Sequence, residues 1–162
     1  MKKNCHQVGF GFDSHAYSSH GTLVLGGIKF PDVPALRGHS DGDALLHALI
    51  DALLGGAGLG DIGDFFPDSS PKYKEISSKI LLRDVVSKVT KKGFSILHVD
   101  LTVVAEKPRL SKVKSKMKKS ISRLLKISSD SVNLKAKTAE GLQIFSPPGG
   151  VLVWAVATLQ SQ

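Results

Sequence analysis

The sequence contains few of the features that tie a chain covalently or hold it in a membrane. One cysteine, Cys5, is present among 162 residues, so no internal disulfide can form, and we interpret it as a free thiol without a functional role. No apolar run approaches the roughly 20 residues that a membrane-spanning helix needs, and the first residues show no signal or transit pattern. We therefore expect a cytoplasmic protein with no membrane partner.

Aromatic residues make up only 6% of the sequence, and acidic residues are absent from residues 111–126. This stretch carries seven Lys and Arg side chains, which account for almost all of the net charge of +8. Its apolar residues recur at helical spacing, which predicts an amphipathic helix with a solvated cationic face. The alternative is a surface for nucleic acid or another polyanion, but no aromatic stacking pattern accompanies the lysines. We expect no nucleic-acid partner.

The length and a hydrophobic content of 41% predict one domain, spanning residues 1–162, with a core of its own. Strands and helices alternate along the chain with short connections, and this order predicts an α/β (α+β) fold with a single layer of helices packed on a mixed β-sheet. The expected strands cover residues 6–12, 22–29, 95–106, 132–138 and 151–160. The expected helices cover residues 41–58, 77–92 and 111–126.

Asp13 and His15 lie two residues apart at the end of the first expected strand. In a strand this spacing points both side chains to the same side, so the two can share one target. Gly9 and Gly11 precede them, and we expect these glycines to bring the backbone close to whatever is bound.

Asp43, His47 and Asp51 follow at four-residue intervals in an otherwise apolar helix, where they predict one polar stripe. Taken alone, His47 is explained by a hydrogen bond to Asp43 or Asp51 inside the core. Together with Asp13 and His15 it completes an Asp, His, His set, which are ligand types that zinc accepts, with a fourth position left for substrate. Asp43 or Asp51 would then orient the His47 ring, and the spacing does not decide which.

Two further segments contain candidates for binding phosphate. His39 and Ser40 precede the expected helix at 41–58, where the free N–H groups of a helix start favour an anion, although Ser40 is equally explained as a simple N-cap. Residues 137–140, Lys-Thr-Ala-Glu, follow a strand and offer a hydroxyl, a cation and a carboxylate, which alone is a weak indication of a phosphate and cation site.

Taken together, these segments resemble the 2-C-methyl-D-erythritol 2,4-cyclodiphosphate synthase family. The resemblance runs from GFGFDSH to KAKTAEGL, and its most specific part is the block HSDGDALLHALIDALLGGAGLGDIGDFFPDSSPKYK. It implies a homotrimer with active sites between subunits, a zinc ion on the residues matching Asp13, His15 and His47, and a second cation, magnesium or manganese, on Glu140.

The resemblance also implies roles for neighbouring positions. His39 and Thr138 match catalytic residues that polarise phosphate in the transition state. The contacts to the substrate match Asp13, His15, His39, Ser40, Asp61, Ile62, Gly63, Phe66, Pro67, Asp68, Ser69, Ser70, Lys137, Thr138, Ala139 and Glu140. The contacts to the cytidine match Ala105, Lys107, Pro108, Arg109 and Leu110.

The implied activity is that of a phosphorus-oxygen lyase. The substrate, 4-diphosphocytidyl-2-C-methyl-D-erythritol 2-phosphate, would cyclise by intramolecular phosphoryl transfer and release CMP. Two other classes of function fit parts of the sequence: a metal-dependent phosphohydrolase would use the same Asp, His, His set to activate water, and a polyanion-binding protein would use the lysine-rich helix.

The sequence departs from the family pattern near its C-terminal end. Lys137 stands where a hydroxyl is usual and Gly141 where a lysine is usual, and Pro147 and Gly149 occupy the places of an Arg and a Glu. These changes affect the segment that the family pattern associates with phosphate or isoprenoid diphosphate binding in the central channel of the trimer. The metal ligands lie elsewhere, so we expect the metal chemistry to be retained.

Overall fold

The computed structural model describes residues 5–142, 144 and 149–162. Its main sheet contains four strands in the order β1-β6-β4-β5. The neighbouring pairs β1–β6 and β6–β4 are antiparallel, and β4–β5 is parallel, so the predicted mixed sheet is confirmed. The strands are β1 (His6–Ala16), β4 (Phe94–Ala105), β5 (Val132–Lys137) and β6 (Gly150–Ser161).

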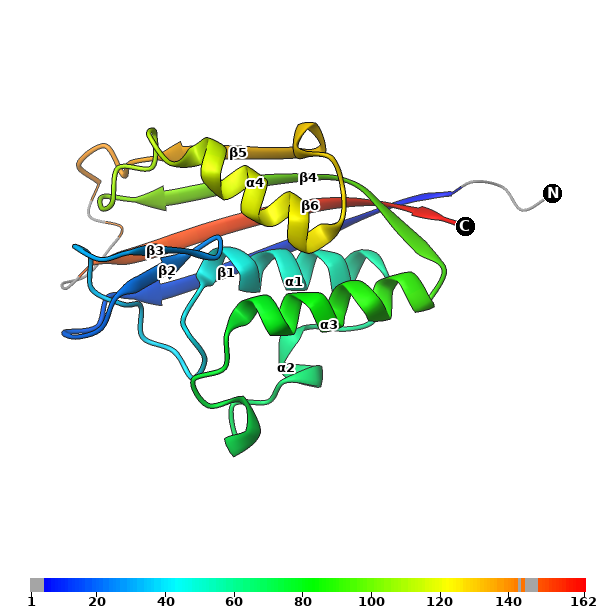
Figure 1. Cartoon of the computed structure of the whole chain (residues 1–162), viewed down its shortest axis with the longest axis horizontal. Helices are drawn as coiled ribbons and strands as arrows, with labels where there is room; N and C mark the ends of the chain where they lie inside the picture. The colour runs from blue at the N-terminus through cyan, green and yellow to red at the C-terminus, as the bar shows by residue number, and fades with distance from the viewer. Residues whose placement is uncertain (1–4, 143, 145–148) are drawn as a thin grey trace.

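Three helices, α1 (Ala44–Gly56), α3 (Ser78–Lys91) and α4 (Lys114–Leu125), cover one face of this sheet (Figure 1). Helix α1 packs on β1 and β6, α4 packs on β5, and α3 lies against both α1 and α4. Alternate side chains of the central strands point into this layer and are fully buried, among them Leu101 and Val153. The core therefore lies between the sheet and the helices, as the alternation of elements predicts.

The segment expected as one strand at residues 22–29 is instead a hairpin of two short strands, β2 (Leu23–Leu25) and β3 (Ile28–Phe30). Gly26 and Gly27 form the turn with φ of 60° and 72°. A two-residue turn that needs positive φ at both central positions favours glycine, so the Gly-Gly pair is the reason for the break.

The segment at residues 60–74, expected as a loop, contains two short helices that were not predicted from the sequence. Helix α2 (Ile62–Phe65) begins at a capping box in which Asp61 and Asp64 accept from each other's backbone N–H groups at 3.2 and 3.1 Å. The 3-10 helix η1 (Pro71–Tyr73) follows, and a second one, η2 (Ser129–Ser131), precedes β5.

The lysine-rich helix is amphipathic, as predicted. Met117 and Ile121 of α4 are fully buried, whereas Lys116, Lys119 and Arg123 are exposed. In the part of the chain that the structure describes, no helix combines the length and the apolar character needed to cross a bilayer.

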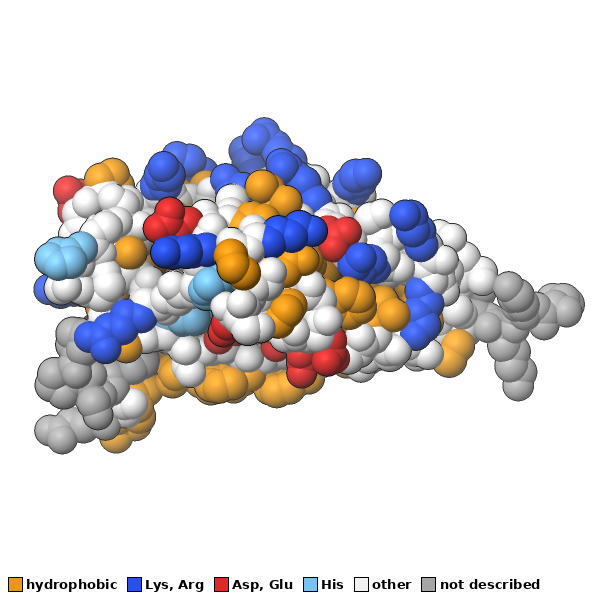
Figure 2. Space-filling model, turned by 90° about the horizontal axis from the view of Figure 1, so that it is seen from below, with side chains coloured by type: hydrophobic (Ala, Val, Ile, Leu, Met, Phe, Trp, Pro, Cys, Tyr) orange, Lys and Arg blue, Asp and Glu red, His pale blue; other side chains and the backbone are white. Residues whose placement is uncertain are grey.

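The face of the sheet opposite the helices carries large apolar side chains that none of the described elements covers. Val8, Phe10 and Phe12 of β1 are 68%, 63% and 45% exposed, and Val156 of β6 lies opposite Phe10. The rings of Phe12 and Trp154 are also cross-strand neighbours, with centroids 5.5 Å apart. Figure 2 shows hydrophobic side chains gathered along one edge of the molecule and Lys and Arg along the opposite edge.

Candidate metal centre

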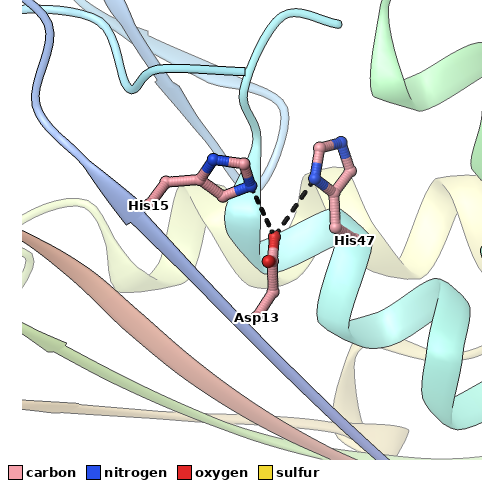
Figure 3. A group of neighbouring side chains, drawn as sticks. All are labelled: Asp13, His15 and His47. Carbon is pink, nitrogen blue, oxygen red and sulfur yellow. Dashed lines mark hydrogen bonds and ion pairs between the residues drawn. The ribbon is translucent and has the colours of Figure 1, made fainter. Parts of the chain in front are cut away.

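Asp13, His15 and His47 converge on one point (Figure 3). The carboxylate oxygen Oδ2 of Asp13 lies 2.9 Å from Nε2 of His15 and 3.1 Å from Nδ1 of His47, and one donor atom from each residue falls within 4.8 Å of the other two. Strand β1 extends to Ala16, further than expected, so Asp13 and His15 keep the two-residue alternation and both face α1. The arrangement fits a small cation bound by one oxygen and two nitrogens.

Gly9 and Gly11 set the distance between β1 and α1. A Cβ atom on Gly9 would lie 1.8 Å from the carbonyl oxygen of Ala52, and one on Gly11 would lie 2.0 Å from that of Ala48. The expectation that these glycines approach a ligand is therefore wrong, because the backbone they approach is that of α1. Their effect on the site is indirect: they allow His47 of α1 to reach the two ligands on β1.

The charges of the three side chains support one another. Burial alone would raise the pKa of Asp13, but the adjacent His15 and His47 rings outweigh burial and hold that pKa well below its usual range. Burial would lower the pKa of His15, and the Asp13 carboxylate raises it instead. Asp13 is therefore an anion at neutral pH, as a ligand for a divalent cation must be.

The partners of His47 differ from those expected. Its Nε2 atom lies 2.8 Å from the Ser78 hydroxyl and 3.0 Å from that of Ser40. Neither Asp43 nor Asp51 supports the ring: Asp43 is the N-cap of α1 and accepts from the backbone of Leu46, Gly26 and Gly27, and Asp51 accepts from the Ile62 amide at 2.8 Å. The polar stripe predicted from the four-residue spacing is thus three separate interactions.

The start of α1 is not free for a phosphate. Helix α1 begins at Ala44, later than the expected residue 41, and the Asp43 carboxylate already accepts from the Leu46 amide at 3.1 Å. Ser40 is therefore not the N-cap, and its hydroxyl faces His47 instead. His39 lies in the same loop, and its Nε2 is 3.2 Å from the carbonyl oxygen of Ser70.

A pocket of about 290 Å³ opens beside the three ligands. Its wall combines residues that the sequence assigned to metal or substrate with others that it did not assign. The assigned residues are Asp13, His15, His39, Ser40, His47, Ile62, Gly63, Phe66 and Asp68. The unassigned ones are Gly38, Asp51, Tyr73 and Leu81. Of these, only Asp51, about two turns into α1, belonged to the polar stripe predicted from the sequence.

A second pocket, of about 530 Å³, lies between the β4–α4 connection and the end of β5. It is lined by most of the residues expected to bind cytidine and by those expected at the second cation. These are Ala105, Pro108, Arg109, Leu110, Lys137, Thr138 and Glu140, joined by Glu106, Ser111, Lys114 and Ala136. The Thr138 hydroxyl donates to Glu140, and Glu106 accepts from the Ala139 amide at 2.8 Å. Lys114 belongs to the lysine-rich helix, which the sequence predicted as a solvated cationic face.

The remaining assigned residues line neither of these two pockets. Asp61 caps α2, and Ser70 binds His39 through its carbonyl oxygen. The Lys107 carbonyl accepts from the Tyr17 hydroxyl. Pro67 and Ser69 are exposed beside the metal pocket, and Ala139 is buried beside the second one. Among the positions that depart from the family pattern, Gly141 and Gly149 are described and Pro147 lies outside the described residues.

The sequence model of the YgbB family matches residues 6–160. The chain belongs to the YgbB family. A similar relative is the 2-C-methyl-D-erythritol 2,4-cyclodiphosphate synthase of Syntrophobacter fumaroxidans, which is 49% identical over 96% of this chain and 98% of its own length. The bifunctional enzyme IspD/IspF of Aliarcobacter butzleri is 47% identical over 94% of this chain, which spans only 41% of that relative.

Solved structures share the fold of this chain. The structure of IspF from Plasmodium falciparum in complex with CDP matches with a TM-score of 0.85 and 32% identity, over 99% of both chains. The family resemblance carried by the Asp-Ser-His segment and the long block around His47 is therefore confirmed.

Proposed function

We propose that this chain converts 4-diphosphocytidyl-2-C-methyl-D-erythritol 2-phosphate to 2-C-methyl-D-erythritol 2,4-cyclodiphosphate and CMP. Membership of the YgbB family supports the reaction, and the observation that carries it is the convergence of Asp13, His15 and His47 at the wall of a pocket. An oxygen of the 2-phosphate attacks the β-phosphorus, and the bond from that phosphorus to the oxygen of CMP breaks. The electron pair leaves with CMP, so no protein nucleophile is needed.

The residues of the metal pocket would hold the two reacting phosphates together. A zinc ion on Asp13, His15 and His47 would fix and partly neutralise the phosphate oxygens. His39 and Ser40 line the same pocket and would hydrogen-bond those oxygens. Because the nucleophile is tethered to its target, orientation supplies much of the rate, and well-oriented intramolecular reactions gain up to about 7–11 kcal/mol.

The second pocket would bind the cytidine diphosphate part of the substrate. Arg109 and Leu110 line it together with Thr138 and Glu140, which supports a nucleotide beside a second cation, magnesium or manganese, on Glu140. The bound CDP named for the Plasmodium falciparum structure supports the same class of ligand. Thr138 would polarise the phosphate from this side, as His39 does from the other.

The separation of the two pockets supports the proposed homotrimer. The metal ligands and the residues expected around cytidine line different pockets of one chain, whereas the reaction needs both groups on one substrate. The exposed apolar face of the sheet supplies a surface on which copies of the chain would pack. Active sites between subunits would then combine the metal pocket of one chain with the cytidine pocket of the next. A cytoplasmic location stays a prediction from the sequence.

The direct test is incubation of the purified protein with the proposed substrate and magnesium, with and without a chelator. We expect chelator-sensitive release of CMP, together with the phosphorus spectrum of a cyclic diphosphate. Release of free inorganic phosphate would instead indicate the phosphohydrolase reaction, and no turnover by metal-loaded protein would contradict both.

A pair of histidine variants tests the role of the metal ligands. His47→Ala should abolish turnover and bound zinc because it removes one of three ligands, whereas His20→Ala, at an exposed histidine that lines neither pocket, should retain both. Equal loss in the two variants would contradict the ligand assignment. Zinc content is measured by elemental analysis and turnover by CMP release.

A further inference from the structure

Ser78 is one of the few polar residues that the core encloses completely, and neither the family pattern quoted above nor the proposed mechanism uses it. It is the first residue of α3 and reaches His47 from a separate element, with its hydroxyl 2.8 Å from Nε2 of that ring. The same hydroxyl contacts the Asp41 carboxylate, and the Ser78 amide donates to Asp41 Oδ2 at 3.1 Å. Ser78 does not line the metal pocket, so it lies behind the ring, away from substrate.

The direction of these hydrogen bonds follows from what each group can donate. An ionised carboxylate only accepts, so the single hydroxyl proton of Ser78 points to Asp41. The Ser78 oxygen must then accept from His47, which places the ring proton on Nε2. The Nδ1 lone pair is left facing Asp13 Oδ2 at 3.1 Å, so that both atoms present lone pairs to one point, as two ligands of a common cation do.

We infer that Asp41 and Ser78 are positioning residues for the metal centre: together they fix the tautomer of His47, so that Nδ1 and not Nε2 binds the cation. The inference rests on the metal site of the proposed function. The same reasoning gives the tautomer of His15. Its Nδ1 contacts the carbonyl oxygen of Arg37, which only accepts, and its Nε2 faces Asp13. A backbone carbonyl cannot be replaced by substitution, whereas the Asp41–Ser78 pair can.

Ser40 is the competing partner of His47, and its position gives it another role. Its hydroxyl is 3.0 Å from Nε2, slightly further than that of Ser78, and among the described residues no carboxylate accepts from it. Ser40 also lines the pocket, where its proton can turn toward a phosphate. The ring proton therefore goes to Ser78.

Two variants test the pair by different means. Ser78→Ala removes the acceptor. Asp41→Asn keeps the shape of the side chain but replaces one acceptor oxygen with an NH2 donor. The Ser78 amide still requires an oxygen at the Oδ2 position, so the NH2 group faces the Ser78 hydroxyl and donates to it. That hydroxyl is then free to donate to Nε2, which would move the ring proton to Nδ1. A purely structural role for Asp41 would be largely preserved by this isosteric change.

The experiment measures cobalt binding by visible absorption and ring nitrogen shifts by NMR on zinc-loaded protein. Loss of such a partner of a ligating histidine typically costs 10–100-fold in metal affinity. We expect a loss of this size in both variants, and Nε2 protonation of His47 in the unmodified protein. Ser122→Ala is the matched control, because Ser122 is a buried helix serine whose hydroxyl donates to the Lys119 carbonyl of its own helix, at 3.2 Å. It should bind cobalt normally.

Unchanged cobalt affinity in Ser78→Ala or Asp41→Asn, or a proton on Nδ1 in the zinc-loaded protein, would overturn the inference. Failure of Ser78→Ala to fold is detected by its thermal transition, and Asp41→Asn then decides the result. Turnover is measured in a separate assay, by release of CMP. If cobalt affinity depends on Asp41 and Ser78 but the unmodified protein does not cyclise the substrate, the positioning role is supported and the proposed reaction is contradicted.

Discussion

At the scale of single residues, Asp43 is a buried carboxylate that joins two elements. It is fully enclosed and accepts from Gly26 and Gly27 in the β2–β3 turn at 2.8 and 2.6 Å, and from Leu46 in α1 at 3.1 Å. Asp43→Ala would leave these donors without an acceptor, each at a cost of roughly 1–3 kcal/mol. We expect a loss of about 3 kcal/mol or more in the free energy of unfolding, measured by urea titration at fixed protein concentration.

Asp64→Ala is the control for Asp43, because Asp64 belongs to the exposed capping box of α2. Water replaces the lost acceptor there, so we expect a cost of about 1 kcal/mol or less. Equal costs for the two variants would show that the buried contacts of Asp43 contribute little.

The residues around His47 show which part of the site could be predicted from the sequence. The types of Asp13, His15 and His47 indicated a shared zinc site, and the family resemblance implied the same three ligands. The spacing added only that Asp13 and His15 point to one side of a strand. The hydrogen-bond partners could not be predicted. Asp43 and His47 are four residues apart, but Asp43 turns to the backbone of a hairpin 16 residues earlier, and His47 bonds a serine 31 residues later.

At the scale of elements, the packing of α1 on β1 depends on Gly11 of β1. At Gly11 a Cβ atom would lie 2.0 Å from the Ala48 carbonyl oxygen and 2.7 Å from the Ala52 amide, and neither backbone atom can move aside. Gly11→Ala should therefore force α1 away from β1, destabilise the fold by roughly 1–3 kcal/mol or more, and weaken cobalt binding because His47 moves relative to Asp13.

Gly55→Ala is the matched change on the same helix. Its Cβ atom would meet nothing closer than the Phe10 carbonyl oxygen at 4.0 Å, and alanine is the better helix former. We expect a gain of about 0.5–1 kcal/mol in the free energy of unfolding. If both alanine variants had the same stability, the close approach at Gly11 would not limit the packing.

The parallel pair β4–β5 carries a pH-dependent ion pair. Burial would raise the pKa of Asp100, but hydrogen bonds from Lys135 at 2.7 Å and Asn133 at 2.9 Å lower it below its usual value. A carboxyl whose folded pKa is lowered stabilises the fold above the unfolded value of 3.8, and this contribution is lost as the pH falls through the folded pKa. We expect Asp100→Asn to cost about 0.5 kcal/mol at pH 7, because the pair is partly exposed.

The difference between Asp100→Asn and the unmodified protein should disappear as the pH falls below 3.8, which unfolding curves at pH 7 and in acid would show. Asp84→Asn is the control, since Asp84 forms an exposed pair with Lys88 at 3.3 Å within α3 and has a side chain 47% exposed. A cost for Asp100→Asn that is the same at both pH values would contradict the ion pair as its cause.

The elements themselves follow closely from the sequence, apart from places where turns or caps interrupt a hydrophobic run. Apolar alternation predicted β4, β5 and β6, and helical spacing predicted the buried face of α4. The Gly26-Gly27 turn was missed because an apolar run on both sides of it reads as one strand. Helix α2 was missed because four residues are too few for a periodic pattern, although its capping box is present in the sequence.

At the scale of the whole molecule, the uncovered face of the sheet is where the proposed trimer would form. Phe10 of β1 is 63% exposed, and its cross-strand partner Val156 is 36% exposed. A contiguous apolar surface of this kind usually marks an interface. Phe10→Glu places a charge in it, and desolvation of an unpaired carboxylate disfavours association. We expect this variant to be a monomer by light scattering, whereas the unmodified protein has the mass of three chains.

The control is Ile80→Glu, because Ile80 is similarly exposed, at 53%, but lies on α3 and not on the sheet. It should remain a trimer. The monomer made by Phe10→Glu should still bind cobalt, since Asp13, His15 and His47 all come from one chain. It should not turn over substrate, because the metal pocket would lack the cytidine pocket of a neighbour. A monomeric variant with full activity would show that one chain brings both pockets to one substrate, and a trimeric Phe10→Glu would place the interface elsewhere.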